Sequence, residues 1–134
     1  AELGVTFCDL PTLLKESDVI SVHVRYSTDS HQLIGADQLA QMKPGTLLIN
    51  TARGNVMDNA AVAESLQQGH LGGVGLDVFE VEPVPADHPI MACEQVVLTP
   101  HCADQTPEGA ELLNLGAVDN VLAYLDGQPQ NVVT

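Results

Sequence analysis

The sequence predicts an α/β fold with a parallel sheet, and three observations support this prediction. Short apolar runs recur along the chain, and segments with helical spacing separate them. The 134 residues are 45% hydrophobic, with no Trp, two Phe and two Tyr. A core built mainly from Val, Leu, Ile and Ala favours layered sheet and helix over an aromatic-rich surface. The length suits one domain with one core, since single domains commonly have about 100 to 150 residues.

Four apolar runs are the predicted strands. Each is short, rich in β-branched residues and apolar on both faces, which is typical of strands buried in a parallel sheet. The runs cover residues 19–24, 46–50, 73–78 and 96–99.

Helical patterns lie between these runs, at residues 10–15, 36–41 and 59–68. Their alternation with strands indicates βαβ units with right-handed crossovers. A longer helix is predicted over residues 107–125, where Thr106 and Pro107 form a cap-and-first-turn start and Gly127 follows the end. The acidic, proline-rich stretch 80–89 is predicted to be an exposed loop.

Charge and cysteine content restrict the partners and the compartment. The net charge is −14, with 18 acidic residues against the four cations Lys15, Arg25, Lys43 and Arg53. Nucleic acid and anionic membranes are therefore poor partners. Three cysteines without a CxxC pair indicate neither a disulfide framework nor a zinc site. With no signal-like N-terminus and no long apolar stretch, a soluble protein of the reducing cytoplasm is expected.

Arg53 is the first candidate functional residue. It follows the predicted strand 46–50 by three residues, after Thr51 and Ala52 and before Gly54. Ligand groups gather at such carboxyl ends of parallel strands. The planar guanidinium could hold a carboxylate through two hydrogen bonds. The alternative is a surface Arg paired with a nearby acid.

Two further strand ends carry polar candidates. Asp77 lies at the end of the run 73–78, and His101 follows the run 96–99, so both should emerge at the same edge of the sheet as Arg53. A histidine with a carboxylate partner moves protons near neutral pH, and Glu82 is the candidate partner. The alternative is that Asp77 caps a turn and Glu82 is a solvated acid.

The other histidines lack the spacing of metal ligands. They are interpreted as structural or solvated, and no metal site is predicted. They are His23, His31, His70 and His88.

Five blocks in this order, SDVISVHV, LIGADQLAQMKPGTLLIN, NTARG, GLDVFEVEP and TPH, resemble the signature blocks of the NAD-dependent D-2-hydroxyacid dehydrogenases. This family includes phosphoglycerate, glycerate and formate dehydrogenases, and the resemblance covers nearly the whole chain. It implies a Rossmann-like domain and hydride transfer between NAD and a D-2-hydroxy or 2-keto acid. The residues leave NADP as an open alternative.

The resemblance also implies roles for particular residues. Arg53 would bind the substrate carboxylate and carbonyl oxygen, His101 would exchange the hydroxyl proton, and Glu82 would orient His101. The chain departs from the family pattern at Arg25, where Pro is frequent, and at Cys102 to Asp104, where Ile-Gly-Gly or Ile-Gly-Ala is common. The cofactor would lie against Val24, Thr51, Ala52, Arg53, Asp77, His101 and Ala103.

No GxGxxG phosphate loop occurs, and Gly73-Val74-Gly75 runs into a strand rather than leaving one for a helix. The resemblance therefore implies that residues 1–134 are a partial NAD-binding domain, its C-terminal half without the first βαβ unit. Little turnover is expected from this chain alone. In the family's strand order the absent first strand would pair with the run 19–24, so an exposed apolar edge and a homodimer are expected.

Two other functions remain open at this point. One is a non-catalytic half-domain that folds, self-associates and at most binds dinucleotide weakly. The other is a corepressor-like relative in which NAD binding controls assembly, against which the joint presence of Arg53, Glu82 and His101 argues.

Overall fold

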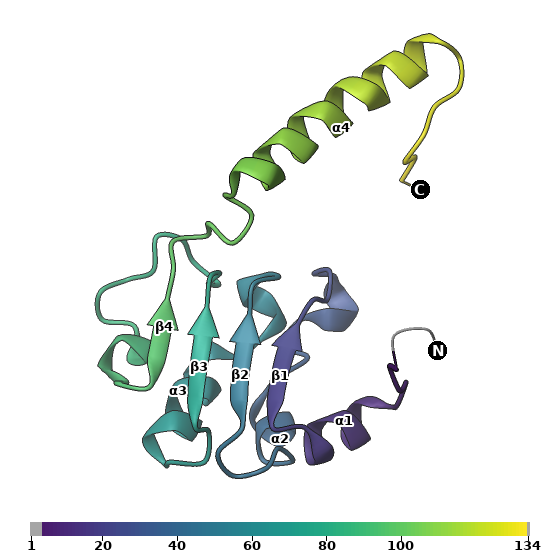
Figure 1. Ribbon diagram of the computed structural model, residues 1–134. Helices are drawn as coiled ribbons and strands as arrows, with labels where there is room; N and C mark the ends of the chain where they lie inside the picture. The colour runs from purple at the N-terminus through teal and green to yellow at the C-terminus, as the bar shows by residue number, and fades with distance from the viewer. Residues whose placement is uncertain (1–3, 134) are drawn as a thin grey trace. The chain divides into compact units, whose positions relative to one another are not determined.

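The computed structural model describes residues 4–133 and contains four strands and four α-helices in this range (Figure 1). The chain divides into two units, the first ending at His101 and the second beginning at Cys102.

The first unit is built on a parallel sheet with the strand order β1-β2-β3-β4. The strands are β1 (Val19–Val22), β2 (Leu47–Asn50), β3 (Gly73–Leu76) and β4 (Val96–Leu98). All three pairings are parallel, and Val22 lies opposite Asn50, which lies opposite Leu76. The predicted α/β parallel-sheet fold is confirmed. Strand β2 ends where its apolar run ends, whereas the other three strands end one or two residues earlier, so residues 23–24, 77–78 and 99 belong to the loops beyond the sheet.

Three helices complete the first unit: α1 (Leu10–Glu16), α2 (Ala36–Leu39) and α3 (Asn59–Gln67). The Asp9 carboxylate caps α1 through the Thr12 N–H at 3.0 Å, and the Asp58 carboxylate caps α3. Helix α2 is shorter than the predicted 36–41. Pro44 disfavours helical backbone at the residue before it, and the chain then turns through Gly45, whose φ is 86°.

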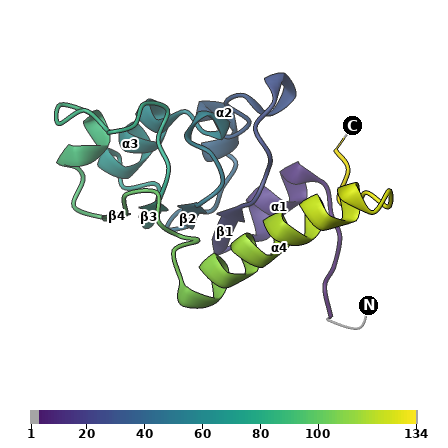
Figure 2. The ribbon, with the colours of Figure 1, turned by 90° about the horizontal axis from the view of Figure 1, so that it is seen from above.

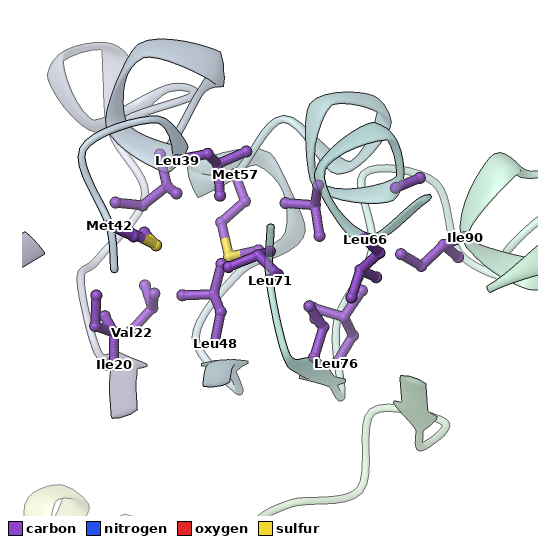
Figure 3. Packing of buried hydrophobic residues seen from close by; sticks show 14 of the residues in the cluster. Ile20, Val22, Leu39, Met42, Leu48, Met57, Leu66, Leu71, Leu76 and Ile90 are labelled. Atoms are coloured by element: carbon purple, nitrogen blue, oxygen red, sulfur yellow. The ribbon is translucent and has the colours of Figure 1, made fainter. Parts of the chain in front are cut away.

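The core lies between one face of the sheet and helices α2 and α3, which lie on the same side of the sheet (Figure 2). Figure 3 shows Val22, Leu48 and Leu76 of the strands directed toward Leu39 and Leu66 of the helices. These side chains are at most 5% exposed. Burial of such side chains contributes about 1.5 to 3 kcal/mol each.

The opposite face of the sheet is exposed, contrary to the prediction that the strands are buried on both faces. Burial alternates along β1 and β2, and the side chains of Val19, Leu47 and Val97 on the other face are 53%, 45% and 69% exposed. The expectation of strands buried on both faces is therefore wrong for these strands. An apolar run indicates a strand that is suited to burial on both faces. Which faces are buried depends on where helices pack against the sheet.

The second unit consists mainly of helix α4 (Pro107–Leu125), which has the bounds that its sequence predicts. The Thr106 hydroxyl accepts a hydrogen bond from the Gly109 N–H at 2.9 Å, and Pro107 occupies the first turn. No residue of α4 is buried, and its leucines are all more than half exposed.

Over residues 4–133, no helix has both the length and the apolar character needed to cross a membrane.

Candidate active site

The loop that follows β2 is held by Asn50, the last residue of the strand. The buried Asn50 side chain accepts a hydrogen bond from the Ala52 N–H at 2.9 Å and donates to the Arg53 carbonyl oxygen at 3.0 Å. Arg53 Nη1 donates to the Ala52 carbonyl oxygen at 2.6 Å. Asn50 thereby fixes the backbone that presents Arg53. Asn50 is not among the site residues predicted from the sequence, although Asn at a strand end before a tight loop is a signal for such side-chain-to-backbone bonds.

Gly54 joins the Arg53 loop to the segment after β3. A Cβ atom at this position would lie 1.9 Å from the Phe79 carbonyl carbon and 2.4 Å from the Glu80 nitrogen. Only a residue without a side chain permits this approach of two backbones. The contact brings the loop that carries Arg53 against the segment that leads to Glu82.

Replacing Gly54 by Ala is expected to lower the free energy of unfolding by about 1 to 3 kcal/mol, because backbone atoms cannot move aside as a flexible side chain can. Denaturant unfolding of this chain measures the change. Gly75→Ala is the matched control, since its Cβ would meet the Ile49 side chain at an ordinary 3.7 Å. Equal stability of the two variants would contradict the role given to Gly54.

His101 and Glu82 form a hydrogen-bonded ion pair beyond the carboxyl ends of β4 and β3. His101 Nδ1 donates to Glu82 Oε2 at 2.8 Å, and the Phe79 N–H donates to Glu82 Oε1 at 2.9 Å. His101 has a φ of 54°, in the left-handed region that non-glycine residues rarely occupy. Such conformations gather at functional sites, where the surrounding structure holds them.

The pair shifts the pKa of both members toward the charged forms. The pKa of Glu82 is lowered, first by the hydrogen bond from His101 and then by that from the Phe79 N–H. The pKa of His101 is raised, first by the hydrogen bond to Glu82 and then by the charge of Glu82. The positive charge of Arg53 lowers the pKa of His101 and so opposes these two effects of Glu82.

These shifts predict a pH window for the stability that the pair contributes. The Glu82 part is present above its ordinary pKa of 4.5 and is lost as pH falls through the lowered value. The His101 part is present below its ordinary pKa of 6.5 and is lost as pH rises through the raised value. The melting temperature of Glu82→Gln should therefore fall furthest below that of the unchanged chain between about pH 4.5 and 6.5, and a difference independent of pH would contradict this assignment.

Asp77 follows β3 directly and is buried, with 3% of its surface exposed. Its N–H donates to the Asn50 carbonyl oxygen at 3.0 Å, and its carboxylate accepts a hydrogen bond from the Thr99 hydroxyl. Asp77 and His101 both line a cavity of about 600 Å³. A carboxylate held this way between two strand ends is a fixed feature of the site.

A second cavity, of about 730 Å³, gathers most of the candidate residues. All three candidate catalytic residues and three of the other candidate cofactor residues line this cavity. These are Arg53, Glu82 and His101, with Val24, Thr51 and Ala52. Asp77 lines only the neighbouring cavity, and Ala103 belongs to the second unit.

The remaining histidines have local partners. His23 shares a hydrogen bond with the Ser21 hydroxyl at 2.8 Å, and His70 with the Leu39 carbonyl oxygen at 3.0 Å. His31 contacts the Tyr26 ring edge-on, and His88 accepts a hydrogen bond from the Ile90 N–H. Within residues 4–133, no three His, Cys, Asp or Glu side chains are grouped as metal ligands would be.

Residues 1–103 match the family model of the NAD-binding domain of D-isomer specific 2-hydroxyacid dehydrogenases. The chain is 41% identical over 133 residues to a glyoxylate reductase of Korarchaeum cryptofilum, covering 98% of this chain and 40% of that relative. It is 45% identical over 129 residues to a glycerate dehydrogenase of Methylorubrum extorquens, covering 93% of this chain and 40% of the relative. The chain thus spans about 40% of the length of these curated relatives.

The structure is similar to that of a D-lactate dehydrogenase from Aquifex aeolicus complexed with NAD and lactic acid. The TM-score is 0.81 at 37% sequence identity, over 95% of this chain and 43% of that one.

Proposed function

This chain belongs to the family of NAD-binding domains of D-isomer specific 2-hydroxyacid dehydrogenases, and we propose that it supplies the catalytic residues of an enzyme that transfers hydride between NAD and a D-2-hydroxy acid. The observation that carries the proposal is the His101–Glu82 pair, 2.8 Å apart, in one cavity with Arg53. A proton-transfer group and a carboxylate-binding group are what the interconversion of a 2-keto and a 2-hydroxy acid requires.

In this mechanism Arg53 holds the substrate. Its guanidinium binds the carboxylate and polarises the adjacent carbonyl oxygen, and the Asn50 hydrogen bonds keep the Arg53 backbone in place. Because such contacts orient the substrate on binding, its loss of translational and rotational entropy does not add to the activation barrier of the reaction.

His101 moves the proton. Glu82 occupies Nδ1, so Nε2 is the ring nitrogen that donates to the carbonyl oxygen in reduction and accepts from the hydroxyl in oxidation. The raised pKa of His101, caused first by the hydrogen bond to Glu82, favours the imidazolium form that donates the proton in reduction. Glu82 acts as a positioning residue that fixes the ring and stabilises the protonated form.

The residues around the larger cavity fit the nicotinamide end of a dinucleotide. Its volume of about 730 Å³ lies within the range of small-molecule sites, about 300 to 1,000 Å³, and it opens at the carboxyl ends of β1 and β2. When bound, the nicotinamide supplies or takes up the hydride at substrate C2. Val24, Thr51 and Ala52 would hold it, and Asp77 and Ala103 are proposed cofactor contacts outside this cavity. NAD is proposed as the cofactor, with NADP as the alternative.

The test is an assay of the intact protein that carries this chain. Purified protein should oxidise NADH, followed at 340 nm, in the presence of glyoxylate, hydroxypyruvate or another 2-keto acid. This chain by itself should bind NADH weakly in a calorimetric titration and turn over little. Absence of turnover by the folded intact protein with every 2-keto acid and both NADH and NADPH would refute the proposal and favour a non-catalytic half-domain.

Residues 1–134 are further proposed to form one partial NAD-binding domain that assembles as a homodimer in the cytoplasm. Strand β1 pairs only with β2 among residues 4–133, so one of its edges is open there, and Val19 on the uncovered face of β1 is 53% exposed. Cys8 and Cys93 carry free thiols, as is usual in a reducing compartment. Light scattering at high concentration should give the mass of two chains, and a monomeric mass would contradict the dimer.

A further inference from the structure

Arg25 and Arg53 occupy equivalent places at the ends of two adjacent strands. Val22 and Asn50 are paired in the sheet, and each arginine lies three residues beyond its member of this pair. Both arginines line the cavity of about 730 Å³. Two of the four cations of a chain with a net charge of −14 are thus directed to one site.

The acids of this cavity already have other partners. Glu80 accepts hydrogen bonds from the Asn59 N–H at 3.2 Å and the Asn59 amide at 2.6 Å, and it lies 3.8 Å from His88 Nε2. Glu82 accepts from His101, as described above. Across the part of the chain that the structure describes, neither arginine forms an ion pair with a carboxylate. Neither guanidinium is therefore engaged by a carboxylate of the cavity, and both remain available to an anionic ligand.

The backbone at Arg25 is fixed even though its side chain is exposed. The hydroxyl of Ser30, a residue with 5% of its surface exposed, donates to the Arg25 carbonyl oxygen at 2.9 Å. The Ser27 N–H in turn donates to the Ser30 hydroxyl at 2.7 Å. This network holds the loop after β1, so the guanidinium is attached at a constant position beside the cavity and only the side chain must be ordered on binding.

We infer that Arg25 binds a second oxyanion, beside the carboxylate that Arg53 binds. This inference rests on the proposed function and deepens it by naming the ligand class: a ligand with two separated anionic groups. The second group is a carboxylate, sulfonate or phosphate. It is carried either by the far end of the 2-keto or 2-hydroxy acid or by the dinucleotide.

The experiment compares the intact protein with its Arg25→Gln variant. Substrates are glyoxylate, which has one anionic group, and oxaloacetate and phosphohydroxypyruvate, which carry a distal carboxylate and a distal phosphate. Each is assayed with NADH and NADPH. If the substrate supplies the second oxyanion, kcat/KM for the two acids with a distal anionic group falls by about 10- to 100-fold while that for glyoxylate is unchanged. If the cofactor supplies it, the KM of the dinucleotide rises with all three acids.

A direct titration with inorganic phosphate, followed by calorimetry without cofactor or substrate, adds a readout that does not need turnover. Binding should be about tenfold weaker in Arg25→Gln. Lys43→Gln is the matched control, because Lys43 is paired with Asp18 at 2.9 Å and is not among the residues that line the cavity. Equal kinetics and equal phosphate affinity in the Arg25 variant and the unchanged protein overturn the inference. Failure of the unchanged protein to reduce any 2-keto acid is a different result, which refutes the proposed function.

Discussion

Replacement of His101 by Gln is expected to lower kcat of the intact protein by about 10²- to 10⁴-fold, the usual contribution of general acid–base catalysis. Gln preserves a polar side chain of similar reach but cannot donate and recover a proton in the reaction. The measurement is steady-state reduction of a 2-keto acid with NADH. The KM values should change little, because His101 acts mainly on the reacting oxygen.

Glu82→Gln tests whether the pair acts as a unit. Glu82 acts through His101, so its replacement should lower kcat less than His101→Gln, and the double variant should be no slower than His101→Gln alone. The same replacement removes the leading cause of the raised pKa of His101. Reduction requires the protonated ring, so the alkaline limit of kcat/KM should move to lower pH. An unchanged pH profile would show that Glu82 does not set the protonation of His101.

Arg53→Gln should lower kcat/KM for 2-keto acids by about 10²- to 10³-fold. A charge-assisted hydrogen bond contributes about 1.5 to 3 kcal/mol, and a guanidinium can make two with one carboxylate. Arg53→Lys should recover only part of the loss, since an ammonium keeps the charge without the planar pair of donors. Kinetics over a range of substrate concentrations measure both variants.

The pH profile of Arg53→Gln gives a signature that simple loss of packing would not produce. The charge of Arg53 lowers the pKa of His101, so its removal should move the alkaline limit of reduction to higher pH. This is opposite to the shift expected for Glu82→Gln. Lys43→Gln serves again as the control for a general change of charge. A parallel shift in both active-site variants would contradict the placement of the two groups around His101.

Much of the fold follows from local patterns in the sequence. The apolar runs located all four strands, and the spacing of apolar residues with Thr106 and Pro107 located α4 at its observed bounds. The predicted strand ends were less accurate. The hydrogen bonds between strands stop where the backbone turns away from the sheet, and not where the apolar residues end. Helix α2 likewise ends at Leu39, because Gln41 and Met42 bond to carbonyl oxygens three residues earlier and so form turns instead of α-helix.

The chain order of Arg53, Glu82 and His101 could be predicted because each lies in a recognisable block at or after a strand end. The hydrogen bond between Glu82 and His101 joins residues 19 positions apart, and the one between Asn59 and Glu80 joins residues 21 apart. The approach of Gly54 to Phe79 is equally non-local. No periodicity of 2 or 3.6 residues encodes such contacts.

The sequence alone therefore determined the type and order of the elements and the family of the chain, and it predicted candidate residues for the chemistry. The covered face of the sheet, the left-handed backbone of His101 and the engagement of Glu80 by Asn59 came only from the folded chain. The same holds for the shared cavity of Arg25 and Arg53. The reason is physical: local propensity acts over a few residues, whereas burial, close backbone approach and unmatched charge depend on which distant segments pack together.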